Sequence, residues 1–300
     1  WGWTTYWKRG SGLRAGPHTS LEREMLLENR VAIVTGGAKG MGRGIALKFA
    51  AEGADVVVCD VDVDGCRSVA GEIEALGRKA LAFETDITNK AQIDEMVAST
   101  LKELGTVDVL INCAGGVPGT HGSGATGTFT EEEWDRIVAI NMKGPWLVSE
   151  AVIPTMKEKN WGRIVFVSSM GAVSPVVSVL HYHAAKAGTI GLSLNLAFEL
   201  APYNICVNTI VPGPIETTFW DSLMPPGPER DAFFAAVSKR EVPLGRVGSS
   251  KDIAGAALFF ASELSDYVTG QTLCVAGGQP LLAQEATFNI EAYLRGKGLL

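Results

Sequence analysis

The sequence contains the stretch Val31-Ala32-Ile33-Val34-Thr35-Gly36-Gly37-Ala38-Lys39-Gly40-Met41-Gly42, in which a short apolar run leads directly into closely spaced glycines. The β-branched run predicts a strand that is buried on both faces. A helical pattern follows over residues 45–52 and ends at Gly53. The N-terminus of such a helix offers unpaired N–H groups and a positive dipole end, and glycines let the backbone approach a phosphate. Strand, glycine turn and helix in this order therefore predict a site for the pyrophosphate of a dinucleotide.

A carboxylate follows the next predicted strand. Residues 54–59 form an apolar run that leads to Asp60, about 20 residues past the glycines. A carboxylate at this distance accepts hydrogen bonds from the ribose hydroxyls of an adenosine, and its charge repels a 2′-phosphate. Asp60 is followed by Val61 rather than by a basic residue, so this region favours NAD over NADP.

Strand and helix patterns alternate along the chain from Met25 onward. This alternation predicts an α/β protein with a single-domain Rossmann-like fold, in which a seven-stranded parallel sheet carries helices on both faces. Since no linker separates a second domain, residues 25–300 are expected to form one dinucleotide-binding and catalytic domain. The later strands are expected at residues 79–83, 107–111, 163–169, 204–210 and 271–275, and the later helices at 63–76, 91–104, 131–141, 181–200 and 251–261.

Charge and composition exclude several classes of function. The net charge of −7 argues against non-specific binding to nucleic acid or to an anionic membrane surface. No apolar run reaches the length that spans a membrane. The five cysteines form no C-x-x-C pair and no zinc spacing, so no metal site is expected. Cys59, Cys206 and Cys274 lie in apolar strand-like runs, which predicts small core residues and a reducing, cytoplasmic location.

The first 24 residues differ from the rest of the chain. They carry several aromatic residues without any period, followed by a linker-like stretch at residues 16–20, and they contain no apolar segment of the kind found in signal peptides. Our hypothesis is that native translation starts at Met25 and that residues 1–24 are an extension or a cloning scar. The alternative is a genuine arm whose tryptophans dock on a neighbouring subunit.

Four polar residues further along the chain form a pattern of their own. Tyr182 and Lys186 are four residues apart at the start of a predicted helix, so both lie on one face. Ser169 ends a predicted strand thirteen residues before Tyr182, and Asn141 lies inside a predicted helix, where asparagine is unfavourable. Together with the Thr-Gly-x-x-x-Gly-x-Gly pattern of residues 35–42, this set resembles the single-domain branch of the short-chain dehydrogenase/reductase family.

The resemblance covers about residues 27–278 and implies hydride transfer between a nicotinamide and an alcohol carbon. Removing the alcohol proton needs a base near the operating pH, whereas a free phenol has a pKa of about 10. Tyr182 is expected to be this base in oxidation and the acid in reduction, its pKa lowered by the Lys186 ammonium and the oxidised nicotinamide. Lys186 would also bind the nicotinamide ribose. Ser169 would hydrogen-bond the substrate oxygen, and Asn141 would anchor a water in the proton path.

The resemblance also implies cofactor contacts along the strand ends. Asp86 is expected near the adenine ring, and residues 112–115 are similar to the family's Asn-Asn-Ala-Gly motif, with Cys113 replacing the second asparagine. The backbone after Pro212 and Gly213 would contact the nicotinamide amide. The full set expected to bind NAD is Gly36, Lys39, Gly40, Met41, Gly42, Asp60, Val61, Asp86, Ile87, Asn112, Ala114, Gly115, Tyr182, Lys186, Pro212, Gly213, Ile215 and Thr217.

Lys39 and Asp60 point to different cofactors. Family members that use NADP often carry a basic residue where Lys39 stands, just before Gly40. Asp60 outweighs this signal, because its carboxylate would occupy the space that the 2′-phosphate needs. The expected activity is therefore that of an NAD(H)-dependent oxidoreductase that interconverts a secondary alcohol and a ketone.

Large apolar side chains gather in residues 216–245, which a proline-rich break at residues 225–228 divides. This composition favours a mobile lid over an apolar or cyclic substrate, with ordinary core or subunit packing as the alternative. A Gly/Thr-rich loop at residues 116–128 carries His121, which could border the substrate or be solvated. The resemblance further implies a homotetramer. The apolar tail at residues 280–300 could contact a partner subunit or close the substrate site.

The same residues allow three alternative functions, and each is weighed against one sequence feature. A 3-oxoacyl thioester reductase is disfavoured by Asp60, because such reductases resemble NADP users. An enoyl reductase is disfavoured by the four-residue spacing of Tyr182 and Lys186. A non-catalytic NAD-binding protein is disfavoured by the intact set of Asn141, Ser169, Tyr182 and Lys186.

Overall fold

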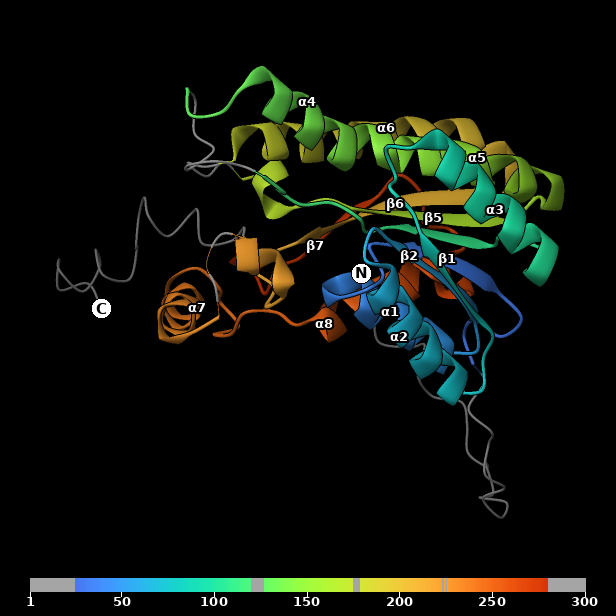
Figure 1. Ribbon diagram of the computed structural model, residues 1–300, viewed down its shortest axis with the longest axis horizontal. Coiled ribbons are helices and arrows are strands. Elements are labelled where there is room, and N and C mark those ends of the chain that lie inside the picture. Colours follow the sequence, from blue (N-terminus) through green and yellow to red (C-terminus); the bar gives the residue numbers. More distant parts are fainter. Residues whose placement is uncertain (1–24, 120–126, 175–178, 223, 225, 280–300) are drawn as a thin grey trace, which may run out of the picture.

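The computed structural model describes residues 25–119, 127–174, 179–222, 224 and 226–279, which include one seven-stranded parallel sheet. The strand order is β3-β2-β1-β4-β5-β6-β7 (Figure 1). The predicted Rossmann-like α/β fold is therefore confirmed. The strands are β1 (Val31–Thr35), β2 (Asp55–Asp60), β3 (Ala80–Glu84), β4 (Val109–Asn112), β5 (Gly162–Val167), β6 (Ile205–Pro212) and β7 (Thr272–Val275).

Helices cover both faces of this sheet (Figure 1). One layer contains α1 (Gly40–Ala51), α2 (Val63–Ala75) and α8 (Ser250–Ala261), and the other contains α3 (Lys90–Leu104), α5 (Gly144–Lys159) and α6 (Leu180–Leu200). Each layer closes its own apolar core against the sheet. The short helix α4 (Glu131–Val138) lies beside α6, and α7 (Pro228–Arg240) lies beyond the carboxyl end of the sheet.

The central strand β1 explains where a ligand can bind. All five of its residues are buried, and Val34 pairs with Val58 of β2 on one side and with Ile111 of β4 on the other. The chain crosses from β1 to β2 and β3 in one direction, and from β4 onward it builds the sheet in the opposite direction. A crevice opens outside the carboxyl ends of strands at such a reversal, so this is where the fold places its binding site.

The helical stretch that carries Asn141 is irregular, as its sequence suggests. A capping box between Thr130 and Glu133 starts α4, which passes without a break into a π-helical turn at Ala139–Lys143 and then into α5. Asn141 lies fully buried inside the π-turn. Such turns interrupt the regular hydrogen-bond ladder and free backbone groups, and they are frequent at functional sites.

The cysteine prediction was partly wrong. Cys59 and Cys206 are buried, as expected, whereas Cys274 is exposed. Cys274 lies in β7, which pairs only with β6 within the described part of the chain and is largely exposed. An apolar run at the edge of a sheet lacks the neighbour that would bury it, which explains the difference.

Some predictions concern residues outside the described ranges: the extension 1–24, His121 and the tail 280–300. Across the residues that are described, we find no helix both long and apolar enough to cross a membrane. The same residues contain no cluster of three histidine, cysteine or carboxylate side chains that could hold a metal ion.

Candidate active site

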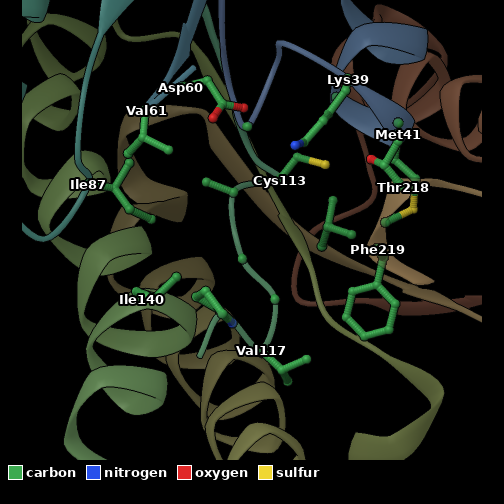
Figure 2. Close-up of a pocket in the computed structure, with 18 of the residues that line it drawn as sticks. Lys39, Met41, Asp60, Val61, Ile87, Cys113, Val117, Ile140, Thr218 and Phe219 are labelled. Carbon is green, nitrogen blue, oxygen red and sulfur yellow. The ribbon is translucent and has the colours of Figure 1, made fainter. Parts of the chain in front are cut away.

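A cavity of about 680 Å³ opens at the carboxyl ends of the central strands. The glycine turn, the ends of β2, β3 and β4, the start of α6 and residues 217–219 all contribute to its walls. Figure 2 shows Asp60, Val61 and Ile87 at one end of this cavity and Val117 and Phe219 at the other. Its size and its position at the strand reversal fit a bound dinucleotide together with a small substrate.

The glycine turn is shaped by close approaches that exclude side chains. Gly36 has a φ of +66°, and a Cβ placed on it would lie 2.7 Å from the Cα of Ala114. A Cβ on Gly42 would lie 2.1 Å from the carbonyl oxygen of Gly36. Lys39 precedes α1 without a side-chain capping bond, so the first N–H groups of this helix remain for a ligand in the cavity. This arrangement fits the pyrophosphate that the sequence predicts here.

Thr35 is a residue whose role the sequence analysis missed. Its hydroxyl accepts hydrogen bonds from the backbone N–H groups of Cys113 (3.1 Å) and Ala114 (3.0 Å), and it lies 3.3 Å from the carbonyl oxygen of Ile111, to which it donates. These bonds fix the backbone after β4 against the glycine turn. A threonine ending a buried strand gives no sequence signal for this role, because its partners lie more than 70 residues away.

Asp60 and its neighbours form the end of the cavity suited to an adenosine. The Asp60 carboxylate accepts hydrogen bonds from the backbone N–H groups of Ala38 (3.4 Å) and Asp62 (3.2 Å), which hold it at the cavity wall. Val61 beside it is 68% exposed. Asp86 also lines the cavity, and its Oδ1 accepts two hydrogen bonds from Thr88, each 2.8 Å long. These carboxylates can accept hydrogen bonds from ribose hydroxyls and an adenine amino group.

Tyr182 and Lys186 line the cavity from the first turns of α6, and both are more than nine-tenths buried. The Lys186 Nζ donates a 2.8 Å hydrogen bond to the carbonyl oxygen of Val167 and lies 5.7 Å from the centroid of the Tyr182 ring. Ser169 hydrogen-bonds with Tyr182. The Ser169 hydroxyl also accepts a 3.2 Å bond from the N–H of Gly171, which fixes its position. The structure thus brings together Ser169, Tyr182 and Lys186 as the sequence predicts.

Burial dominates the proton affinities of these groups. It raises the pKa of Tyr182 to about 12, although the hydrogen bond from Ser169 opposes the rise. Burial also lowers the pKa of Lys186 to about 8. The expected lowering of the Tyr182 pKa by Lys186 together with an oxidised nicotinamide stays a prediction. In the protein alone, the desolvation of the phenolate raises the Tyr182 pKa above its usual value.

Asn141 connects the π-turn to the loop after β4. Its Nδ2 donates to the carbonyl oxygens of Gly116 (2.7 Å) and Ile137 (2.9 Å), and its Oδ1 accepts from the N–H of Gly116 (2.9 Å). A Cβ on Gly115 would lie 2.6 Å from the Asn141 Oδ1 and 2.9 Å from the Lys186 Nζ. Asn141, Gly115 and Lys186 therefore pack closely behind the cavity wall.

Four of the expected cofactor residues do not line this cavity, and neither do the expected catalytic residues Asn141 and Ser169. The Asn112 side chain is buried and donates to the Ser149 hydroxyl of α5, at 3.0 Å. Pro212, Gly213 and Ile215 are not among the residues that line the cavity, and Ile215 lines a second cavity beside residues 242–248. The other expected cofactor residues all line it. Residues that line it without having been expected include Thr85, Val117, Pro118, Arg136, Ser168, Thr218 and Phe219.

Comparisons with characterised proteins agree with this geometry. The family described as enoyl-(acyl carrier protein) reductase matches residues 36–279. The chain is 40% identical over 259 residues to the (2S)-[(R)-hydroxy(phenyl)methyl]succinyl-CoA dehydrogenase subunit BbsD of Thauera aromatica, over 86% of this chain and 100% of that protein. It is 37% identical to the 3-oxoacyl-[acyl-carrier-protein] reductase FabG of Thermotoga maritima, over 85% of this chain and 99% of that protein.

Solved structures give the same answer. A 7α-hydroxysteroid dehydrogenase complexed with NADH and 7-oxo glycochenodeoxycholic acid superposes with a TM-score of 0.78 at 34% identity, over 85% of this chain and 96% of that chain. A short-chain type dehydrogenase/reductase from Mycobacterium marinum superposes with a TM-score of 0.77 at 32% identity, over 85% and 97%. With its strand order, glycine turn and tyrosine–lysine pair, the chain belongs to the short-chain dehydrogenase/reductase family of oxidoreductases.

Proposed function

We propose that this protein is an NAD(H)-dependent oxidoreductase that interconverts a secondary alcohol and a ketone. The observation that carries the proposal is the position of Tyr182, which lines the same cavity as the glycine turn and Asp60 and hydrogen-bonds with Ser169. One cavity thus offers a dinucleotide site and, beside it, a proton donor or acceptor for the oxygen of a substrate. A bound nicotinamide would supply or accept the hydride.

Tyr182, Ser169 and Lys186 would each act on the alcohol or its proton. Ser169 would hydrogen-bond the substrate oxygen and steady the charge that develops on it. Tyr182 is protonated at neutral pH, as an acid that gives its proton to a ketone during reduction must be, and its raised pKa makes it a weaker acid until positive charge lies near the ring. Oxidation needs the phenolate, which positive charge near the ring would stabilise. Protonated Lys186 would supply part of that charge and would bind the nicotinamide ribose, while Asn141 would anchor a water in the proton path.

The choice of NAD over NADP rests on Asp60. Its carboxylate is held by two backbone N–H groups, so it cannot easily turn away from a 2′-phosphate. Lys39 also lines the cavity and would favour the phosphate, but the Asp60 carboxylate would occupy the space that the phosphate needs. A relative whose structure contains NADH supports the same assignment.

A second candidate is reduction of a 3-oxoacyl thioester. Two relatives carry names of this chemistry, one a hydroxyacyl-CoA-type dehydrogenase and the other a 3-oxoacyl-[acyl-carrier-protein] reductase. Their reactions also interconvert an alcohol and a ketone, so the same residues would serve. Asp60 argues against a reductase that uses NADPH, because its carboxylate would repel the 2′-phosphate. It does not argue against a thioester substrate.

We further propose a cytoplasmic homotetramer without nucleic-acid or membrane partners, in which residues 216–245 form a lid over an apolar or cyclic substrate. Within this segment, the 3₁₀-helix Thr218–Ser222 and the helix α7 bring aromatic rings together, with Trp220 packed against Phe219, Phe233 and Phe234. Residues 25–300 would form one domain, and residues 1–24 an extension.

Nicotinamide absorbance with NAD and then NADP tests the main proposal. The panel of secondary alcohols would include polyols, hydroxy acids, cyclic alcohols, aryl alcohols, steroids and 3-hydroxyacyl thioesters. We expect NADH formation with one chemical class. Faster turnover with NADP would contradict the role of Asp60, turnover confined to the thioesters would support the second candidate, and silence across the panel with tight NADH binding would favour a non-catalytic protein.

A further inference from the structure

A small apolar cluster lies at the end of the cavity away from Asp60. It contains Val117, Ile137, Val179 and Tyr182, with the half-buried Phe219 packed against it. Figure 2 shows the Val117 side chain and the Phe219 ring at this end, across the cavity from Asp60 and Val61. The cluster is separate from the two large cores that hold the sheet and its helices together. The cluster therefore forms an apolar wall at this end of the cavity, apart from the cores that stabilise the fold.

Three distant segments supply the wall. Val117 follows β4, Val179 precedes α6, and Phe219 belongs to the 3₁₀-helix after β6. Val179 has a φ of +37°, a left-handed conformation that a β-branched residue adopts only where its surroundings impose it. Strained backbone of this kind is concentrated at binding and catalytic sites. Here it lets the chain enter α6 three residues before Tyr182, with Val179 buried in the cluster.

The aromatic rings in this wall have a defined geometry. The ring centroids of Tyr182 and Phe219 are 5.9 Å apart with an interplanar angle of 40°, and Trp220 packs edge-on against Phe219 at 5.8 Å. These separations fall within the range that aromatic pairs prefer. Phe219 is thus held by Trp220 and still lines the cavity.

The position of the wall relative to the reacting atoms identifies what it would contact. A substrate oxygen that hydrogen-bonds to Tyr182 and Ser169 places its carbon beside the Tyr182 ring. Since Val117 and Phe219 pack against the Tyr182 ring and line the cavity, one substituent of that carbon would lie against them. An apolar wall that contains an aromatic ring favours a flat, apolar substituent and disfavours a hydroxylated one, whose polar groups would lose their hydrogen bonds with water.

We propose that Val117 and Phe219, backed by Ile137 and Val179, form a subsite for an aryl group attached directly to the reacting carbon, with Phe219 as the specificity-determining residue. The proposal rests on the function proposed above and names its substrate class: secondary alcohols in which the alcohol carbon bears an aromatic ring. It applies equally to free alcohols and to thioesters that carry such a carbon.

The ratio of kcat/KM for 1-phenylethanol to that for 2-butanol, measured with NAD, tests this subsite. We expect a ratio of about 10 or more in the unmodified protein, since filling an apolar pocket discriminates by about 10- to 200-fold. Phe219→Ala should lower the ratio about tenfold or more, and Phe219→Leu should restore part of it. Phe198→Ala removes a phenylalanine of α6 that is 88% exposed and does not line the cavity, so it should leave the ratio unchanged.

Calorimetric titration of acetophenone into the protein saturated with NAD gives a readout that does not depend on turnover. Phe219→Ala should weaken acetophenone binding about tenfold, while NADH affinity stays within about threefold of the unmodified protein. Equal kcat/KM values for the two alcohols, or an equal loss of both in Phe219→Ala, would overturn the subsite and leave the proposed function standing. Acetophenone binding that depends on Phe219, without turnover of any alcohol, would support the subsite and overturn the proposed function. A protein that neither binds acetophenone nor prefers 1-phenylethanol to 2-butanol would overturn the subsite.

Discussion

The two ends of the cavity differ in how their side chains are held. At the Asp60 end, backbone N–H groups fix a carboxylate beside a glycine turn, and Val61 and Asp86 remain exposed. At the opposite end, Tyr182 and Lys186 are buried among apolar groups, and their pKa values are shifted by that burial. Under the proposed function, the first end would bind the cofactor through fixed backbone and charge, whereas the second would hold the groups that transfer a proton away from water.

The difference predicts that adenosine binding and the proton-transfer chemistry depend mainly on different parts of this site. Short-range backbone contacts build the Asp60 end, so a change there should alter cofactor affinity. Side chains from several distant segments build the Tyr182 end, so a change there should alter turnover. Variants that affect one end alone test whether the two ends are in fact independent.

Replacing Tyr182 should produce the largest effect. Tyr182→Phe removes the hydroxyl and keeps the ring that packs against Phe219, so turnover should fall by about 10²- to 10⁴-fold. NADH affinity, measured by fluorescence titration, should stay within about threefold because the Asp60 end is untouched. Undiminished turnover would remove Tyr182 from its proposed role, and a large loss of NADH affinity would show that the two ends are coupled.

A change in the glycine turn should act in the opposite way. Gly42→Ala would place a Cβ 2.1 Å from the Gly36 carbonyl oxygen, so the turn must move away from a bound pyrophosphate. Losing one hydrogen bond to a charged phosphate costs about 1.5–3 kcal/mol, which corresponds to an NADH affinity about 10- to 150-fold weaker. Gly71→Ala in α2 is the matched control, because a Cβ there meets no atom within 4 Å. Equal NADH affinities in the two variants would contradict the pyrophosphate site.

The pH dependence of stability should reveal the burial of Lys186, with a smaller effect. Its pKa is about 8 in the folded protein, whereas lysine in an unfolded chain titrates near 10.4. Between these pH values the unfolded chain holds a proton that the folded protein has lost, so the free energy of unfolding rises with pH. This gain is absent below about pH 8. The raised pKa of Tyr182 acts only above about pH 10, where the folded protein keeps a proton that the unfolded chain loses and stability falls.

Chemical denaturation at pH 7.5 and pH 9.5 measures this effect. From the lower to the higher pH, the unmodified protein should gain about 1–2 kcal/mol relative to Lys186→Met, which lacks the titrating group. Identical pH dependence in the two proteins would mean that Lys186 keeps its ordinary pKa when folded. That result would also weaken the contrast between the two ends of the cavity.

The sequence alone determined the sheet, the glycine turn and the pair Tyr182 and Lys186. These features follow from local rules: apolar runs become buried strands, glycines occur where a side chain would clash, and residues four apart share a helix face. Asp60 could be placed for the same reason, because the length of the helix between two parallel strands sets where the second strand ends.

Only the tertiary structure decided how these residues meet the rest of the chain. It turned Asn112 toward α5, exposed Cys274 on an edge strand, and brought Thr35 to the backbone after β4. It also joined Val117, Val179 and Phe219 around Tyr182, and raised the Tyr182 pKa where the motif alone suggests a lower one. Burial, strand neighbours and contacts between distant segments are properties of the folded chain, because each depends on residues that no local pattern contains.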